Sequence, residues 1–204
     1  MWGEIPLFLV THRSVPANNF AELVALMKSK PGQLTLSTVG VGSIHHLNAE
    51  AMKAALGVDV LVVQYKGVGP AVQALVGGQV SMSVSALPAL VPHLKSGTIR
   101  ILAANTPKRT SLSPDTPTIA ESGAPGFDYP AGLGVLARAG TPAPIIARLS
   151  TEVVGALRHG DNPKRLADLG FEIVGSTPEE YAARIKSDLA KYAKVVKDAG
   201  IKAN

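Results

Sequence analysis

The sequence contains no cysteine and few aromatic residues, and both absences restrict what the protein can be. Without cysteine, disulfide bridges, thiolate metal sites and cysteine nucleophiles are all excluded, while a periplasmic and a cytoplasmic location stay equally compatible. Aromatic residues make up 4% of the chain, so the 46% that is hydrophobic comes mainly from Ala, Val, Leu and Ile. This composition is typical of helices packed on a sheet rather than of an aromatic-rich sandwich.

Long apolar runs are also missing. No segment approaches the roughly 18 apolar residues that a membrane-spanning helix needs. The first ten residues have no basic region and include Glu4 and Pro6, which makes them a poor signal peptide. The stretch Leu7–Val10 instead predicts a buried strand. A chain that opens on a core strand leads us to expect that a preceding segment is missing.

Charged residues are sparse, at 17%, and the formal net charge is +5 with a pI near 9.5. A positive surplus raises the local concentration of anionic partners. The basic residues are scattered, however, and no basic run is interleaved with aromatic residues. We therefore expect no nucleic-acid partner.

The chain alternates short apolar strands with helical segments, which predicts an α/β fold with largely parallel sheets. Strands are expected at residues 7–10, 34–38, 58–65, 80–84, 98–105, 132–137 and 172–174. Helices are expected at 20–30, from 43 to about 56, from about 70 to 77, and at 85–95, 118–122, 141–159, 163–169 and 177–199. The Pro-, Ser-, Thr- and Gly-rich stretch from 106 to 130 is the candidate boundary between two lobes.

The sharpest local feature is Ser37-Thr38-Val39-Gly40-Val41-Gly42-Ser43, a strand that turns into a helix. Free backbone N–H groups and the positive end of the helix dipole make such a turn suitable for a carboxylate or phosphate. Equally, the glycines could merely form a tight turn and Ser43 cap the helix. The turn is neither a Walker loop nor a dinucleotide fingerprint, because the required Gly-Lys-Ser/Thr and third glycine are absent.

Two further strand-to-helix turns are expected at the same edge of the sheet. One is Tyr65-Lys66-Gly67-Val68-Gly69-Pro70, where Lys66 could attract an anion or be an ordinary solvated lysine. The other contains Ser85, which offers a hydroxyl. Because ligands of parallel α/β sheets bind at the carboxyl ends of strands, these turns are expected to converge on one rim.

Residues with catalytic or metal-binding potential are few. His46 and Glu50 are spaced to share a helix face with His45 beside them, but no third ligand or HExxH motif accompanies them. No Gly-x-Ser-x-Gly nucleophile elbow is present. We therefore expect no metal, no cofactor and no catalytic residue. A hydrolase that uses His45 or His46 as a base remains the alternative.

The sequence resembles a known family over nearly its whole length. In order along the chain, the motifs that carry the resemblance are Ser14-Val15-Pro16-Ala17, Gly32-Gln33-Leu34, Gly42-Ser43 with His46-Leu47, Tyr65-Lys66-Gly67 with Pro70-Ala71, Gly77-Gly78-Gln79-Val80, Leu87-Pro88 with Pro92-His93, Pro117-Thr118-Ile119-Ala120-Glu121, Ala139-Gly140-Thr141-Pro142-Ala143-Pro144, and Gly175-Ser176-Thr177-Pro178-Glu179-Glu180. These are similar to the Bug-type periplasmic solute receptors of tripartite tricarboxylate transporters.

The resemblance implies a two-lobed, type II periplasmic-binding-protein fold that captures a small carboxylate for the membrane components of such a transporter. Residues 10–126 look like a nearly complete second lobe, and residues 1–9 with 131–204 look like the remainder of the first lobe. The expected location is periplasmic. The ligand-binding residues expected at the rim are Thr38, Gly40, Gly42, Ser43, His46, Tyr65, Lys66, Gly67 and Ser85.

Two departures from the family pattern stand out. Roughly the first third, which carries a ligand loop of the first lobe, has no counterpart, so affinity should suffer, and exposed first-lobe edges could drive self-association. A fragment that acts through self-association is therefore a further alternative. The other departure is the third turn, where Ser81, Ser85 and Ala86 stand at positions that often include acidic residues in the family. Fewer negative charges at the rim should favour anions.

Overall fold

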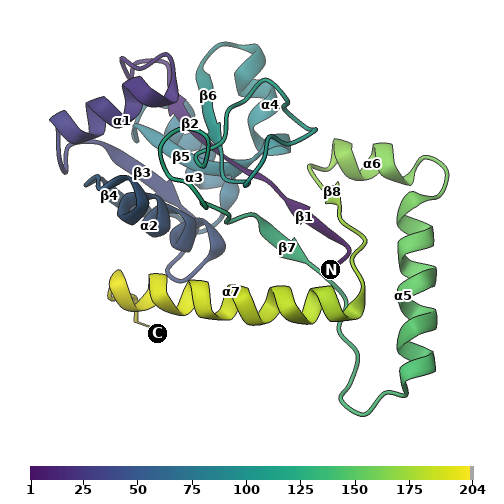
Figure 1. Cartoon of the computed structure of the whole chain (residues 1–204). Helices are drawn as coiled ribbons and strands as arrows, with labels where there is room; N and C mark the ends of the chain where they lie inside the picture. The colour runs from purple at the N-terminus through teal and green to yellow at the C-terminus, as the bar shows by residue number, and fades with distance from the viewer. Residues whose placement is uncertain (203–204) are drawn as a thin grey trace.

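Two β-sheets organise the chain, as Figure 1 shows. The computed structural model describes residues 1–202. The larger sheet contains β2 (Leu7–His12), β3 (Thr35–Thr38), β4 (Leu61–Gln64), β5 (Met82–Ala86) and β6 (Ile99–Ala104). They lie in the order β4-β3-β5-β2-β6. β3 is parallel to β4 and to β5, whereas β2 is antiparallel to both of its neighbours, so β2 alone runs against the other four strands.

Helices cover both faces of the larger sheet. Leu7 and Leu9 of β2 belong to the cluster that packs α1 (Phe20–Ser29) and α2 (Ile44–Leu56) on one face. Phe8 and Val10 belong to the cluster with α3 (Val68–Val76) and α4 (Leu87–Lys95). Successive strand side chains point to opposite faces, so these two clusters are separated by the sheet.

The smaller sheet has β1 (Gly3–Ile5) between β7 (Ala131–Leu133) and β8 (Glu172–Ile173), and both pairings are antiparallel. Beside it stand α5 (Ala143–Arg158) and α6 (Asn162–Asp168), away from the larger sheet (Figure 1). The last helix, α7 (Pro178–Asp198), runs beneath both parts, and its Val195 joins the core cluster of α1 and α2.

Two segments cross between the sheets. Pro6 separates β1 from β2, and residues 105–130 connect β6 to β7. Asn105, which is 1% exposed, links the crossings: its Oδ1 accepts from the Leu7 N–H at 2.8 Å and its Nδ2 donates to the Tyr129 carbonyl at 2.6 Å. One buried amide therefore holds both crossings together.

The predicted α/β class is confirmed, and so are three of the helix starts that were read from capping residues. Asn19, Ser43 and Thr177 all accept a hydrogen bond from the first turn of their helices, and Thr177 forms a complete capping box with Glu180. β1 was not predicted, because its three residues are too few to show a period. The smaller sheet also differs from the parallel arrangement that the sequence predicted, since it is wholly antiparallel.

Several expected elements differ in the structure, and the strand predicted at 58–65, for example, begins only at Leu61. The predicted helix at 118–122 is a turn: Thr118 and Glu121 form the expected capping contact at 3.0 Å, but Gly123, with a φ of 126°, and Pro125 follow too soon for a helix to continue. The predicted helix at 85–95 begins only at Leu87, because Ser85 and Ala86 pair with β2. The strand predicted at 132–137 ends at Leu133.

Candidate functional site

The carboxyl ends of three neighbouring parallel strands form one rim of the larger sheet. β3 ends at Thr38, β4 at Gln64 and β5 at Ala86, and Thr38 is in register with Gln64. Each strand leads by a short turn into a helix, namely α2, α3 and α4. The N-termini of three helices consequently lie along this rim, where their dipoles favour negative charge.

The first two strands are joined at the rim by specific hydrogen bonds. Thr38 is fully buried, and its hydroxyl donates to the Gln64 side-chain carbonyl at 2.7 Å. The Tyr65 N–H donates to the Thr38 carbonyl at 2.8 Å. Thr38 therefore fixes the spacing between the turn after β3 and the turn after β4. Its own hydroxyl is already used in the hydrogen bond to Gln64.

The turn before α2 is held by the helix that follows it. The Ser43 hydroxyl accepts from the His46 N–H at 3.2 Å, and the Gly42 N–H donates to His46 Nδ1 at 3.1 Å. The Ser43 N–H donates to the Gly40 carbonyl at 3.3 Å. Gly40 and Gly42 have φ values of 93° and 74°, which only glycine adopts readily. The amides of Gly42 and Ser43 are thus used inside the turn.

Free donors nevertheless remain on this rim. Within residues 1–202, the N–H groups of Gly40, Val41, Ile44 and His45 have no hydrogen-bond acceptor. The N-cap residues of α3 and α4 are Gly67 and Ala86, and neither of them makes a side-chain capping bond. Uncapped first turns leave backbone N–H groups available to an anion.

The charges along the rim favour an anion. No Asp or Glu occurs between Asp59 and Asp115, a stretch that contains the β4 and β5 turns, and the α2 turn also has none. Lys66 is exposed in the β4 turn. The Gly67 that follows has a φ of 119° and brings the chain into α3. An anion at this rim would therefore meet backbone N–H donors and the Lys66 cation, and no carboxylate in these turns would repel it.

Ser85 does not lie on the same face of the sheet as Thr38. Ser85 and Ser83 are two residues apart in β5 and therefore share a face of the sheet. Ser83 is in register with Ser37, whose hydroxyl donates to the Ala71 carbonyl of α3 at 3.3 Å, so this is the α3 side. Thr38, one residue later, points to the α2 side. Ser85 is 1% exposed, and its hydroxyl has no partner within the described residues. Tyr65 is half-buried against the α3 and α4 cluster.

The two histidines are desolvated and favour the neutral form. Burial lowers the pKa of His45 below its usual 6.5. Burial also lowers the pKa of His46, a shift that Glu50 opposes and Lys53 reinforces. Because His46 Nδ1 accepts from Gly42, the proton of the neutral ring sits on Nε2, which lies 3.8 Å from the Glu50 carboxylate. His46 thus holds the turn before α2 in place through its hydrogen bond with the Gly42 N–H.

Other kinds of site are not found in the part of the chain that the structure describes. Residues 1–202 contain no group of three His, Asp or Glu side chains placed to hold a metal ion. Over the same residues, no helix combines the length and the apolar character needed to cross a membrane.

Sequence reasoning missed Gln64 and the amides of Ile44 and His45. Gln64 could have been found from its place at the end of β4, since a polar residue there adjoins the neighbouring turn. The free amides could not be predicted from the sequence. Ser43 and His46 each accept a hydrogen bond from one backbone N–H group, and only the structure shows which N–H groups these are.

Comparisons with known proteins agree over nearly the whole chain. The family model described as "Tripartite tricarboxylate transporter family receptor" matches residues 2–201. Protein BugT of Bordetella pertussis is 33% identical over 202 residues, covering 99% of this chain and 62% of its own length. A UPF0065 protein of Agrobacterium vitis is 31% identical and is covered over 58% of its length. The chain thus spans less than two thirds of these curated relatives.

Solved structures give the same picture. R. palustris Rpa4515 with adipate has 34% identity and a TM-score of 0.83, with 98% of this chain and 67% of that chain covered. MatC from Rhodopseudomonas palustris with bound malate has 32% identity and a TM-score of 0.75, with 95% and 67% covered. The fold is that of type II periplasmic binding proteins, as the sequence resemblance implied.

Proposed function

Because this chain belongs to the tripartite tricarboxylate transporter receptor family, we propose that it is the solute-binding component of such a transporter. Its ligand is a small carboxylate. The observation that carries this proposal is the rim itself, where the N-termini of α2, α3 and α4 lie along one sheet edge with free backbone donors and no acidic residue. Adipate and malate in two of the solved relatives support the same ligand class.

In this proposal the residues of the rim have separate roles. The N–H groups of Gly40 and Val41 and the start of α2 bind one carboxylate. Lys66 attracts the anion, and Gly67 allows close approach to the first turn of α3. Thr38, Gly42, Ser43 and His46 hold the α2 turn in shape, whereas Tyr65 and Ser85 lie behind the β4 and β5 turns.

The remaining parts of the proposal concern the whole receptor. Residues 10–126 form the second lobe together with residues 7–9, because β2 begins at Leu7 and belongs to the larger sheet, and residues 1–6 with 131–204 contribute to the first lobe. The protein works in the periplasm and delivers its solute to the membrane components of the transporter. The division into lobes is supported by the two separate sheets.

The alternative of a hydrolase with His45 or His46 as base has little support from the geometry. His46 Nδ1 accepts the Gly42 N–H, and its other nitrogen faces Glu50. A hydrolase predicts turnover of an ester or amide that is abolished by His45→Ala or His46→Ala, whereas a receptor predicts binding without turnover.

Isothermal titration with adipate and malate tests the proposal. We expect saturable binding that Lys66→Glu weakens at least tenfold, because the variant puts a carboxylate beside the ligand. Lys30→Glu is the matched control. Lys30 is exposed at the end of α1, shortly before β3 begins, and so lies near the amino ends of the strands, opposite the rim. Equal loss in both variants would point to general charge attraction and contradict a site at the rim.

Self-association through the first-lobe edges stays a prediction. Its structural basis is that β7 and β8 are the outer strands of the smaller sheet and leave their outer edges unpaired. Light scattering tests it, since pairing of these edges yields a defined dimer.

A further inference from the structure

The ring of His46 is bonded to the turn that carries free donors of the rim. Its Nδ1 accepts from the Gly42 N–H at 3.1 Å, and its backbone N–H donates to the Ser43 hydroxyl at 3.2 Å. In the same turn, the N–H groups of Gly40 and Val41 find no acceptor within residues 1–202. A neutral imidazole has one acceptor nitrogen, whereas a protonated imidazole donates from both nitrogens. The hydrogen bond from Gly42 therefore exists only while His46 is neutral.

Packing gives this turn little support. A Cβ atom on Gly40 or Gly42 would meet no other atom within 4 Å in the described part of the chain, and Val41 is 52% exposed. Both glycines have positive φ values, and glycine has a wide choice of backbone conformations. The hydrogen bonds of Ser43 and His46 consequently decide the shape of the turn, and the loss of one of them lets it move.

Charged neighbours on α2 control the protonation of His46. Glu50 lies 3.8 Å from its Nε2 and favours the protonated ring, while Lys53, at 2.9 Å from Glu50, disfavours it. His45 beside it is also desolvated, and the His45 Nδ1 has no partner within the described residues. Burial is the largest effect and lowers the pKa of His46 below its usual 6.5. His46 is therefore neutral at pH 7 and becomes protonated at lower pH.

The other elements that pack against α2 add no charge that acts directly on His46. β3 and β5 contain no charged residue. Asp128, in the connecting segment beside α2, is paired with Arg184. α7 contributes three charged side chains to the cavity that it shares with α2, and each is paired within α7: Lys191, Lys194 and Asp198. Glu50 and Lys53 are therefore the charges that, with burial, set the pKa of His46.

Protonation of His46 has two opposing effects on an anion at the rim. It adds a positive charge, which attracts the anion, and it breaks the hydrogen bond from Gly42, which lets the turn move. The added charge is offset by Glu50 at 3.8 Å, and the residue is 9% exposed. The broken bond, by contrast, leaves two N–H donors facing each other across 3.1 Å in the turn itself. The second effect is therefore the larger one, and acid should weaken binding.

We propose that His46 is a pH-sensitive positioning residue for the carboxylate site at the rim. The neutral ring holds the Gly42 N–H and thereby keeps the N–H groups of Gly40 and Val41 in place for the ligand. Protonation of the ring releases the turn and weakens binding, and the charges of Glu50 and Lys53 set the pH at which this happens. The inference rests on the proposed function, because it concerns the same site.

Isothermal titration of the whole chain with adipate and malate from pH 8 to pH 5 tests the inference, with His46→Asn as the reference variant. The Oδ1 of asparagine takes the place of Nδ1 as an acceptor but does not titrate. Protonation of the ligand affects both proteins alike, so the ratio of their dissociation constants isolates the ring. We expect wild-type binding to weaken by about threefold to tenfold relative to His46→Asn as the pH falls, which is the effect of losing one hydrogen bond. His46→Ala, which has no acceptor, should bind more weakly than His46→Asn at pH 8.

Two variants of the neighbouring charges test the sign of the effect. Glu50→Gln removes a charge that raises the pKa of His46, so the fall in binding should move to lower pH. Lys53→Met removes a charge that lowers this pKa, so the fall should move to higher pH. A merely structural role would not move the midpoint in opposite directions. His159→Asn is the control: His159 is exposed at the end of α5, and its variant should keep the wild-type midpoint.

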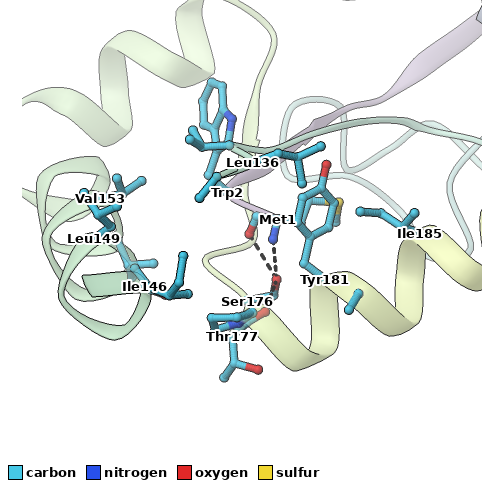
Figure 2. Close-up of a pocket in the computed structure, with 16 residues that line it drawn as sticks. Met1, Trp2, Leu136, Ile146, Leu149, Val153, Ser176, Thr177, Tyr181 and Ile185 are labelled. Carbon is cyan, nitrogen blue, oxygen red and sulfur yellow. Dashed lines mark hydrogen bonds between the residues drawn. The ribbon is translucent and has the colours of Figure 1, made fainter. Parts of the chain in front are cut away.

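The apolar cavity that Figure 2 shows between α5, α7 and the start of the chain is the rival place for a carboxylate with an apolar chain. It has a volume of about 280 Å³, and no histidine is among the residues that line it. Binding there would not follow the protonation of His46. Leu149→Asp puts a charge on the wall of this cavity, so the variant should leave binding at the rim and its pH profile unchanged.

Nuclear magnetic resonance of the free wild-type protein provides a signature that needs no variant. At pH 8 the ring nitrogens of His46 should show the proton on Nε2. As the pH falls, the Gly42 amide signal should move with the same midpoint as the ring. Circular dichroism establishes that each variant used in the titrations is folded.

A wild-type pH profile in His46→Asn, or a shift of the midpoint in the same direction by Glu50→Gln and Lys53→Met, would overturn the inference and leave the proposed function standing. A Gly42 signal that does not follow the ring would do the same. Loss of binding in Leu149→Asp would place the ligand in the apolar cavity and contradict both proposals. Absence of binding at every pH would overturn the proposed function, and this inference with it.

Discussion

The Nδ2 of Asn105 donates to the carbonyl oxygen of Tyr129 at 2.6 Å, and so links the two ends of the segment that connects the larger sheet to the smaller one. The Oδ1 of the same side chain accepts the Leu7 N–H of the other crossing at 2.8 Å. The two contacts use the acceptor and a donor of one buried amide. Asn105 therefore stabilises the path of both chain segments between the sheets.

Asn105→Ala should lower the free energy of unfolding by about 1–3 kcal/mol, because it leaves the buried Leu7 N–H without an acceptor. Asn105→Asp should also destabilise the protein, since a carboxylate would face the Tyr129 carbonyl in place of a donor. Urea unfolding followed by circular dichroism measures both. Asn18→Ala, at an exposed position, is the control and should change little. Equal effects at positions 18 and 105 would contradict the role of Asn105.

Gly67→Ala tests the backbone at the start of α3. Gly67 has φ 119° and ψ 170°, a region that costs other residues about 1–3 kcal/mol. We expect this substitution to destabilise the protein and to weaken carboxylate binding, because the turn must shift to relieve the strain. Gly69→Ala is the control, because it is the same substitution two residues away. Gly69 lies inside α3, and no neighbouring atom lies within 4 Å of the methyl group that the substitution adds. It should be neutral or stabilising. Similar losses in the two variants would contradict the account.

Arg184 of α7 joins this helix to the segment before β7. Its Nη1 lies 3.0 Å from Asp128 and its Nε 2.9 Å from Asp188. Glu4 is also near: burial raises its pKa, and the Arg184 charge opposes that rise. Arg184→Met should therefore cost up to about 3 kcal/mol at pH 7, because it leaves the partly buried Asp128 without its cation, whereas Asp188 keeps Lys191 at 2.7 Å.

The part of this loss that comes from Glu4 should shrink as the pH falls through the raised native pKa of Glu4 and its usual 4.5, because the carboxyl group is then neutral and no longer needs the Arg184 charge. Thermal unfolding between pH 7 and pH 4 measures this. Arg148→Met is the control, since the Arg148–Glu152 pair is exposed and 4.0 Å apart, and it should change stability by less than about 1 kcal/mol. A pH-independent loss would contradict the electrostatic explanation.

The desolvated histidines predict a second pH dependence. Burial lowers the native pKa of His45 and His46 below the 6.5 of the unfolded chain, so the unfolded state takes up protons first as the pH falls. Their contribution to stability is complete above pH 6.5 and is lost below it, down through the native pKa values. The double variant His45→Gln, His46→Gln should lose part of this slope in unfolding experiments. An unchanged slope would contradict the burial of the two rings.

Much of the fold could be predicted from the sequence, because local signals agree with it. Capping residues at Asn19, Ser43 and Thr177 mark helix starts, and glycine turns mark the strand ends. The short turn at Thr118 was misleading, since its capping contact forms without a helix. Contacts between distant segments, such as Asp128 with Arg184, leave no trace in a single sequence.

The candidate site was predictable only in outline. Strand-to-helix turns located the rim, but the use of each donor is decided by packing. His46 turns back to the Gly42 amide, and Ser85 points to the other face of the sheet from Thr38. A sequence gives the residue types at a turn, whereas the pairing of their donors and acceptors follows from the three-dimensional arrangement.

The most direct test of the central claim is a titration with adipate and malate followed by the backbone amide signals in nuclear magnetic resonance. The account predicts saturable shifts of the Gly40, Val41, Ile44 and His45 amides and of the first-turn amides of α3. Saturable binding whose shifts lie away from these amides, or no binding at all, would contradict it.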